Sequence, residues 1–352
     1  MARRWIDAMR VAGRFLLWLL AFASAGWGVL ALRYFDHLDE TLCTALAAAF
    51  GVAALVLLAA MVSRRWRRRA ALAYLVLFAL LLARWFAIEP SNDRDWQPEG
   101  ARLASADIDG DRITVHNIRN FDYRTETDFT PGYYDKTYDL RQLDAVDLMA
   151  VYWMGPAIAH VFLSFGFANG DHLAISIEAR KERAEGYSSV KGFFRQYELQ
   201  YIVADERDVV RVRTNYRRDP PEEVHLYRVV GAPEAARRVL LDYLHEVNAL
   251  ARRPQFYNTL TANCTGNIWL HSRVNPGHVP YSWKILASGY LPEYLYEQGR
   301  LDTSIPFDEL QRRSVINPLA VAADQAPDFS RRIRAGLGLA QDPAAGAAAQ
   351  SR

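Results

Sequence analysis

The sequence predicts a membrane-anchored α+β protein, in which three N-terminal transmembrane helices precede a domain with an antiparallel sheet and packed helices. Three nearly uncharged runs of membrane-spanning length fall within the first 90 residues. Segments rich in β-branched and aromatic residues fill the first half of the remaining chain. Helical periodicity dominates the second half, and strands followed by helices are typical of an α+β domain.

The three apolar runs cover residues 15–32, 41–62 and 70–86, and only Arg84 interrupts the third. Each run is close to the roughly 20 residues that a helix needs to cross the hydrocarbon core. A cleaved signal peptide is the alternative for the first run. Because that run is long, has no clear small-x-small cleavage site and is followed by two more, we interpret it as an anchor.

Charge predicts the orientation of these spans. Arginines precede the first run, and the motif "RRWRRR" at 64–69 places five more between the second and third runs. Positive loops stay in the cytoplasm, so the chain after Pro90 is expected on the periplasmic side of a bacterial inner membrane. The first 92 residues hold 11 basic and 5 acidic residues, and the rest hold 31 basic and 35 acidic. The basic excess therefore belongs to topology and does not indicate nucleic-acid binding.

Composition divides the chain into four parts. Residues 1–90 form the predicted three-helix anchor, and 91–100 form a polar, proline-containing linker. Residues 101–339 form the predicted periplasmic domain. The alanine-rich, low-complexity end at 340–352 is predicted to be disordered.

Strands and helices follow one another along the periplasmic domain. A hairpin signal, "ANGD" at 168–171, joins two of the strands. The predicted strands are 112–124, 133–140, 144–154, 159–167, 171–180, 199–204, 208–216 and 222–230. Helices are predicted at 188–199, at 232–253, from about 264, at 282–289 and at 306–313.

Cys264 lies in "FYNTLTANCTGNIW" at 256–269, and the other cysteine, Cys43, lies in the second apolar run. Thr261 and Asn263 are favoured helix N-caps, so Cys264 is predicted in the first turn of a helix. The positive end of that helix favours a thiolate, and its free N–H groups can hold an oxyanion. The alternative is that Cys264 is a small buried filler.

His160 is the histidine that we expect beside this thiol. It begins a very apolar strand, and the next strand carries Glu178. A hairpin through 168–171 opposes residues whose numbers add up to about 339, which brings 160 and 178 together. A carboxylate there would fix the tautomer of the imidazole and stabilise its charged form. The alternatives are a strand-start histidine with a satisfied hydrogen bond and a glutamate paired with Arg180.

Other polar residues give weaker signals. Asn263, Tyr257 and Asn258 are candidate oxyanion or substrate-binding groups. Arg124 belongs to a set that either lines a site for a phosphate or carboxylate or forms a surface ion-pair web. That set is Arg119, Asp122, Tyr123, Arg124, Arg180, Arg213 and Arg217. A zinc site of His160, His172 and Cys264 lacks a close-spaced ligand pair, so we predict no metal and no cofactor.

Several long segments carry a resemblance to a known family. They are 117–140, 155–167, 173–182, 201–217 and 256–268, which begin "NIRNF", "GPAIA", "LAISI", "YIVAD" and "FYNTL". Together they resemble the Lnb N-terminal periplasmic domain family, whose namesake moves an acyl chain within bacterial lipoproteins and has more membrane spans than three. The resemblance implies a thiol mechanism at His160 and Cys264. The His, Glu, Cys order is also similar to permuted papain-like (NlpC-type) enzymes.

These observations predict a thiol acyltransferase or hydrolase that acts on a lipid-linked or lipoprotein ester or amide. Cys264 is the expected nucleophile, His160 the base and Glu178 the group that orients it. The expected partners are the inner membrane and that substrate, and the sequence sets no oligomeric state. The alternatives are a cell-wall amidase and a non-catalytic binding or scaffold domain of the envelope.

Overall fold

The computed structural model describes residues 2–34 and 39–337. The predicted disordered tail at 340–352 lies outside the described residues. The chain divides into two compact units. The first combines Met1–Ser91 with Tyr187–Tyr197, and the second combines Asn92–Gly186 with Glu198–Arg352.

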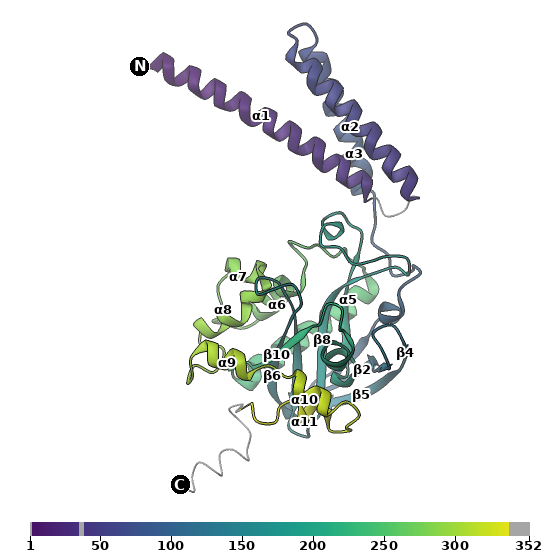
Figure 1. Cartoon of the computed structure of the whole chain (residues 1–352), viewed down its shortest axis with the longest axis vertical. Helices are drawn as coiled ribbons and strands as arrows, with labels where there is room; N and C mark the ends of the chain where they lie inside the picture. Colours follow the sequence, from purple (N-terminus) through teal and green to yellow (C-terminus); the bar gives the residue numbers. More distant parts are fainter. Residues whose placement is uncertain (1, 35–38, 338–352) are drawn as a thin grey trace. The chain divides into compact units, whose positions relative to one another are not determined.

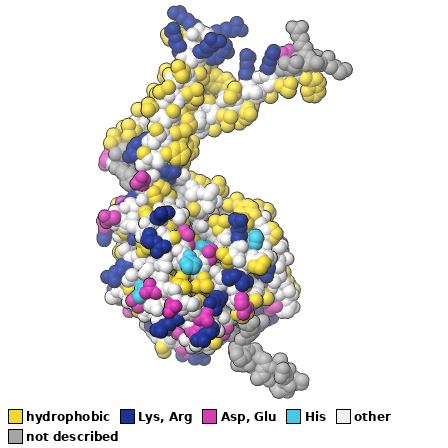
Figure 2. Space-filling model, turned by 180° about the vertical axis from the view of Figure 1, so that it is seen from behind, with side chains coloured by type: hydrophobic (Ala, Val, Ile, Leu, Met, Phe, Trp, Pro, Cys, Tyr) yellow, Lys and Arg dark blue, Asp and Glu magenta, His cyan; other side chains and the backbone are white. Residues whose placement is uncertain are grey.

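The first unit contains three long helices, α1 (Ala2–Arg33), α2 (Glu40–Val62) and α3 (Arg67–Phe86). Each includes a stretch long and apolar enough to cross a membrane, and the stretch in α1 is Met9–Arg33. Apolar side chains cover these helices along their length, and Lys and Arg side chains gather at their ends (Figure 2). The three predicted spans are therefore present as three helices.

Close packing joins the three helices. Gly28 of α1 lies so near Phe50 of α2 and Leu81 of α3 that an added Cβ would meet their side chains at 2.5 and 2.8 Å. The Tyr74 hydroxyl donates to the Ala21 carbonyl oxygen at 3.0 Å, which links α3 to α1. Close packing at small residues and interhelical hydrogen bonds drive helix association in a lipid bilayer, where no hydrophobic driving force acts between helices.

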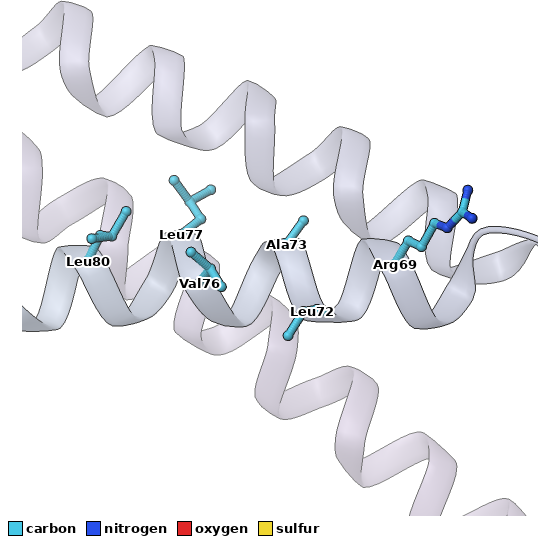
Figure 3. Close-up of a pocket in the computed structure, with 6 residues that line it drawn as sticks. All are labelled: Arg69, Leu72, Ala73, Val76, Leu77 and Leu80. Carbon is cyan, nitrogen blue, oxygen red and sulfur yellow. The ribbon is translucent and has the colours of Figure 1, made fainter.

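One face of α3 remains open. Leu72, Ala73, Val76, Leu77 and Leu80 line a shallow apolar hollow there, with Arg69 at its end (Figure 3). Their spacing of three and four residues places them on a single helix face. An apolar face without a protein partner is expected on a helix that contacts lipid chains.

The segment Tyr187–Tyr197 belongs to the same unit as the helices. The sequence predicted a short helix here, and the structure contains a single 3₁₀ turn, η3 (Lys191–Phe193). The Phe194 ring lies 5.6 Å from the ring of Tyr34 and 6.4 Å from that of Trp85. Arg195 donates to the carbonyl oxygens of Trp85 and Ile88 at 2.8 and 3.2 Å. Contacts with helices that are far away in the sequence, rather than a local residue pattern, therefore stabilise the conformation of this segment.

The second unit, which we call the C-terminal domain, is built on an eight-stranded sheet (Figure 1). The strand order is β1-β2-β9-β8-β7-β6-β10, and β5 pairs with β2 outside this path. The strands are β1 (Ser105–Asp109), β2 (Arg112–Arg119), β5 (Tyr133–Asp139), β6 (Leu143–Tyr152), β7 (Ala159–Phe167), β8 (His172–Arg180), β9 (Glu198–Ala204) and β10 (Glu223–Arg228). Two short strands, β3 (Asp122–Tyr123) and β4 (Phe129–Thr130), pair with each other.

The α+β class is confirmed, but the purely antiparallel sheet is wrong. Strands β2 and β9 are parallel and meet at one pair, Arg119 with Ala204, so the sheet is mixed. The chain turns away directly after this pair. The Asp205 amide donates to the Arg119 carbonyl oxygen, and Asp208 binds the Arg119 guanidinium at 2.6 Å. This local anchoring brings the ends of the two strands together without a long ladder.

Helices cover both faces of the sheet. On one face Phe162, Ala174, Val209, Ile316 and Phe329 belong to a common buried cluster. On the other face α5 packs through Tyr243 against Phe165. The helices of the domain are α4 (Glu206–Arg211), α5 (Pro233–Arg252), α6 (Cys264–Ser272), α7 (Trp283–Leu286), α8 (Leu291–Glu297), α9 (Phe307–Arg313), α10 (Asn317–Ala322) and α11 (Phe329–Arg332).

The strand predicted at 208–216 is wrong, because this segment is helical. It forms the end of α4 and a π-helical turn, η4 (Val212–Tyr216). The N-cap Asp205 accepts from the Arg207 amide, and the fully buried Asp208 accepts from Arg119 and from the Phe121 amide. Buried ion pairs therefore override the apolar pattern that suggested a strand.

Candidate active site

Cys264 is the first residue of α6, as the capping pattern predicts. The Asn263 side chain caps the helix by accepting from the Gly266 amide at 2.7 Å and donates to the Thr259 carbonyl oxygen at 2.7 Å. The Thr265 hydroxyl donates to the Ile285 carbonyl oxygen at 2.6 Å. The start of α6 is thus fixed on both sides, and Cys264 as a residue is half-buried.

His160 is the second residue of β7, at the end of the sheet where β7 and β8 separate. The β7–β6 ladder continues to Ala159, but the β7–β8 ladder ends at the pair Leu163 and Ile175. The register of this ladder is the predicted one to within one residue, so the hairpin prediction is confirmed. Because the pairing with β8 ends at Leu163, the preceding residues of β7 have no ladder partner on that side, and their backbone can meet another group there.

Cys264 and His160 influence each other's protonation. The groups that act on the sulfur are the His160 imidazole, by hydrogen bonding and by its charge, and the Val161 and Thr265 amides, by hydrogen bonding. Burial by itself would raise the pKa of the Cys264 thiol, but these bonds and the charge of the imidazole lower it below its usual value. A sulfur with a lowered pKa and backbone N–H donors beside it has the environment of a reactive cysteine.

A serine connects the imidazole to the carboxylate. The Ser176 hydroxyl lies 2.8 Å from His160 Nε2 and donates to Glu178 Oε1 at 2.8 Å. The direct distance from His160 Nε2 to Glu178 Oε1 is 3.5 Å, which is long for a hydrogen bond but short for a charge interaction. With Nε2 directed at Ser176, Nδ1 is the ring nitrogen available to the thiol.

The charges around this chain of contacts set its protonation. Burial and the charge of Arg213 act to lower the pKa of His160, but its contacts with Cys264 and Glu178 raise it above the usual value. Burial would raise the pKa of Glu178, but His160 and Arg213 hold it well below its usual range. Glu178 is therefore a carboxylate at neutral pH, and it favours the imidazolium and thiolate forms of its neighbours.

Arg213 supports Glu178 from the π-helical turn η4. Its guanidinium lies 2.9 Å from Glu178 Oε1 and 3.4 Å from Glu222 Oε2, and Glu222 also binds Arg217 at 3.0 Å. Sequence reasoning placed Arg213 and Arg217 only in a general polar set. Alternation along β8 places Ser176 on the same side of the strand as Glu178, and this is the signal that could have identified Ser176.

The other predicted site residues have local partners. Asn263 acts as the α6 cap, and the Asn258 side chain accepts from the Leu260 and Thr261 amides at 2.9 and 3.0 Å. Tyr257 is buried. Arg124 binds Asp128 in the β3–β4 hairpin, with 2.5 Å between Nη2 and Oδ1. Their proposed contacts with an oxyanion or a substrate stay predictions.

The web of ion pairs accounts for most of the remaining polar set. Arg119 binds Asp208, and Arg211 binds Asp122 at 3.0 Å. His172, part of the alternative zinc set, lies at the opposite end of β8 from Glu178. Within residues 2–34 and 39–337, no group of three or more His, Cys, Asp or Glu side chains has the arrangement of a metal site.

The structure thus defines a class: a protein with three membrane-spanning helices and an α+β domain that holds a hydrogen-bonded cysteine–histidine pair at a helix start. Residues 129–289 match the model of the Lnb N-terminal periplasmic domain, which confirms the resemblance and places this domain in a membrane-anchored periplasmic protein. The match includes His160, Ser176, Glu178, Arg213 and Cys264. No curated protein and no solved structure matches the chain. The papain-like core stays a prediction.

Proposed function

We propose that the protein is a membrane-anchored thiol acyltransferase or hydrolase that acts on an ester or amide of a lipid-linked or lipoprotein substrate. The observation that carries the proposal is the contact of the Cys264 thiol with the His160 imidazole, at a helix start that supplies backbone N–H groups. Three apolar helices keep the domain at a membrane, where lipid-linked substrates are found. The arginines at 64–69 favour an N-terminus in the cytoplasm and a C-terminal domain in the periplasm.

The first step forms a thioester. The Cys264 sulfur attacks the carbonyl carbon while His160 takes the thiol proton, and the carbonyl oxygen becomes an oxyanion. The N–H groups of Val161 and Thr265, which act on the sulfur in the resting site, are the donors that we assign to this charge. Collapse of the intermediate breaks the bond to the alcohol or amine, which leaves with the proton held by His160.

The second step returns the enzyme to its starting state. An amine, a hydroxyl or water attacks the thioester carbonyl and gives its proton to His160, which passes it to the departing Cys264 sulfur. Glu178 stabilises the imidazolium in both steps, and Ser176 holds the ring in the matching tautomer. The nature of the acceptor decides between a transferase and a hydrolase.

A profile of membranes tests the proposal. Cells that produce the full chain, the Cys264→Ser variant or the matched Cys43→Ser variant are compared by mass spectrometry of their lipoproteins and lipids. We expect Cys43→Ser to reproduce the wild-type profile and Cys264→Ser to lose the modified lipoprotein or lipid. Equal profiles for wild type and Cys264→Ser would refute the proposed acyltransferase activity.

Two further measurements address the alternatives. A thiol-selective acylating probe should label Cys264 in preference to Cys43 at mildly alkaline pH, and absence of labelling would favour a binding or scaffold domain. Cell-wall fragments from the same three strains should be identical. A difference confined to those fragments would instead favour the cell-wall amidase.

A further inference from the structure

A cavity lies in the C-terminal domain, and Cys264 is not among the residues that line it. It has a volume of about 450 Å³ and lies between the start of β6, the first turns of α5 and the second half of α6. Its floor is apolar and includes Leu148 and Leu163 of the sheet, Val239 of α5 and Ile268 of α6. Pockets of this size and lining are typical of small-molecule sites.

The rim of the cavity is basic. Arg238 and Arg300 line it and are anchored through one nitrogen each: Arg238 Nε donates to Asn275 Oδ1 at 2.6 Å, and Arg300 Nη2 donates to the Gly277 carbonyl oxygen at 2.5 Å. Neither arginine forms an ion pair with a carboxylate among the described residues. Asp144 is the acidic residue of the lining, whereas Arg228, a third arginine there, pairs with the buried Asp147 at 2.5 Å. Two arginines without carboxylate partners favour an anion at this rim.

The start of α5 adds to this preference. The helix is 20 residues long and begins at Pro233, and its N-cap residue Ala232 makes no side-chain cap hydrogen bond. Ala235 and Ala236 of this turn line the cavity. The positive end of the helix dipole therefore lies beside the cavity, and Glu234, the acidic residue of this turn, is not part of the lining.

The cavity is also related to the candidate active site through α6. Ile268 and Ser272 follow Cys264 by four and eight residues, so the three share one face of the helix. Ile268 therefore lies about 6 Å from Cys264 along the helix axis, roughly one helical turn. A long apolar chain bound in the cavity would lie along the helix that carries the cysteine.

We propose that this cavity binds a single-chain amphiphile whose apolar chain lies on the floor and whose anionic head group binds Arg238 and Arg300. The head-group chemistry is that of a carboxylate or a phosphate, as in a fatty acid or a lysophospholipid. The binding is non-covalent and does not require the thiol. It therefore stands or falls separately from the proposed reaction of Cys264.

Photolabelling of the full chain in lipid nanodiscs tests this site. The probes are diazirine-bearing dodecanoate, dodecyl phosphate and the uncharged dodecanol, and mass spectrometry locates the labelled peptides. We expect both anionic probes to label peptides of β6, α5 and α6, and to do so equally in the Cys264→Ser variant. If one anionic probe labels more strongly than the other, its head group is the preferred one. If dodecanol labels as strongly as the two anionic probes, the preference for an anion is overturned.

Matched variants distinguish the contribution of the rim to probe binding from that of the floor. Arg238→Glu is expected to weaken labelling by the anionic probes about tenfold, the factor that corresponds to about 1.4 kcal/mol. Its control is Arg237→Glu, which changes the neighbouring arginine that pairs with Asp111 instead of lining the cavity. Asp144→Asn, at an exposed position, should strengthen the same labelling. If Asp144→Asn weakened the labelling, or if Arg237→Glu weakened it as much as Arg238→Glu or more, the proposed binding of the anionic head group at the rim would be contradicted.

Ala236→Trp fills the cavity from α5 and should abolish labelling by all three probes. Ile268→Trp fills it from the opposite wall and provides an independent variant if the first one does not fold. The circular dichroism spectrum of each variant establishes folding. A folded variant with a filled cavity and unchanged labelling of α5 and α6 would refute the site.

Discussion

The carboxylate of Glu178 should control the reactivity of Cys264, although the two residues are connected only through His160. Glu178→Gln keeps the shape of the side chain and removes its charge. The substitution leaves Arg213 close to the imidazole without its nearer carboxylate partner, because that guanidinium lies 2.9 Å from Glu178 Oε1 and 3.4 Å from Glu222 Oε2. The imidazolium then loses an attraction and faces a repulsion, so the thiolate beside it is destabilised as well.

The size of the effect follows from the contacts. The Glu178 carboxylate is mostly buried, with 24% of its side chain exposed, and lies 3.5 Å from His160 Nε2. The hydrogen bonds between the imidazole and this carboxylate run through Ser176, and hydrogen bonds to charged groups contribute about 1.5–3 kcal/mol. Loss of this interaction should raise the thiol pKa, and each 1.4 kcal/mol or so corresponds to a tenfold change in an equilibrium constant. At a pH below the thiol pKa, the thiolate fraction falls by about ten- to a hundredfold.

The pH dependence of alkylation measures this shift without knowledge of the substrate. Iodoacetamide reacts with the thiolate, so the rate at Cys264 in a Cys43→Ser background follows ionisation. The midpoint of the rate profile should move to higher pH in Glu178→Gln. Glu223→Gln is the matched control, because Glu223 binds His225 at 2.8 Å elsewhere in the domain. If the profiles of Glu178→Gln and the parent superimpose, Glu178 does not act on the thiol.

Three further outcomes are expected. His160→Ala should slow acylation of Cys264 at pH 7 by about 10²–10⁴-fold in the probe assay, the usual contribution of a general base. Asn263→Ala should lower the free energy of unfolding of the full chain by about 1 kcal/mol through loss of the α6 cap, measured by denaturant titration. Gly289→Ala should cost about 1–3 kcal/mol in that assay and slow acylation, because its Cβ would lie 2.0 Å from the Pro156 carbonyl oxygen, near His160. Gly186→Ala, which meets nothing within 4 Å, should change neither quantity.

Local signals predicted the parts of the candidate site that depend on neighbouring residues. The cap at Asn263 predicted that a helix begins at Cys264, and the turn at 168–171 predicted the register that brings Glu178 near His160. Both features are encoded within a few residues of the position concerned. Cap chemistry and hairpin geometry have few alternatives, so they can be recognised in a single sequence.

The features that the sequence did not predict depend on contacts between residues far apart in the chain. Ser176 lies between His160 and Glu178 because β7 and β8 separate beyond Leu163, and no residue pattern predicts that separation. Arg213 lies on a π-helical turn where a strand was predicted, because buried ion pairs of α4 outweigh the local pattern. The segment Tyr187–Tyr197 groups with the membrane helices through partners about 100 residues away or more.

The separation of β7 and β8 also provides the physical argument against a filler role for Cys264. A paired β7 would use its N–H and C=O groups in the ladder, so opening the sheet gives up backbone hydrogen bonds. The opened edge instead presents the Val161 amide to a sulfur, and Ser176, Glu178 and Arg213 surround the facing histidine with charge. A cysteine that only fills space needs apolar neighbours, and a continuous sheet would supply these without the loss of backbone hydrogen bonds. The arrangement is accounted for if the thiolate form is the one that the site stabilises.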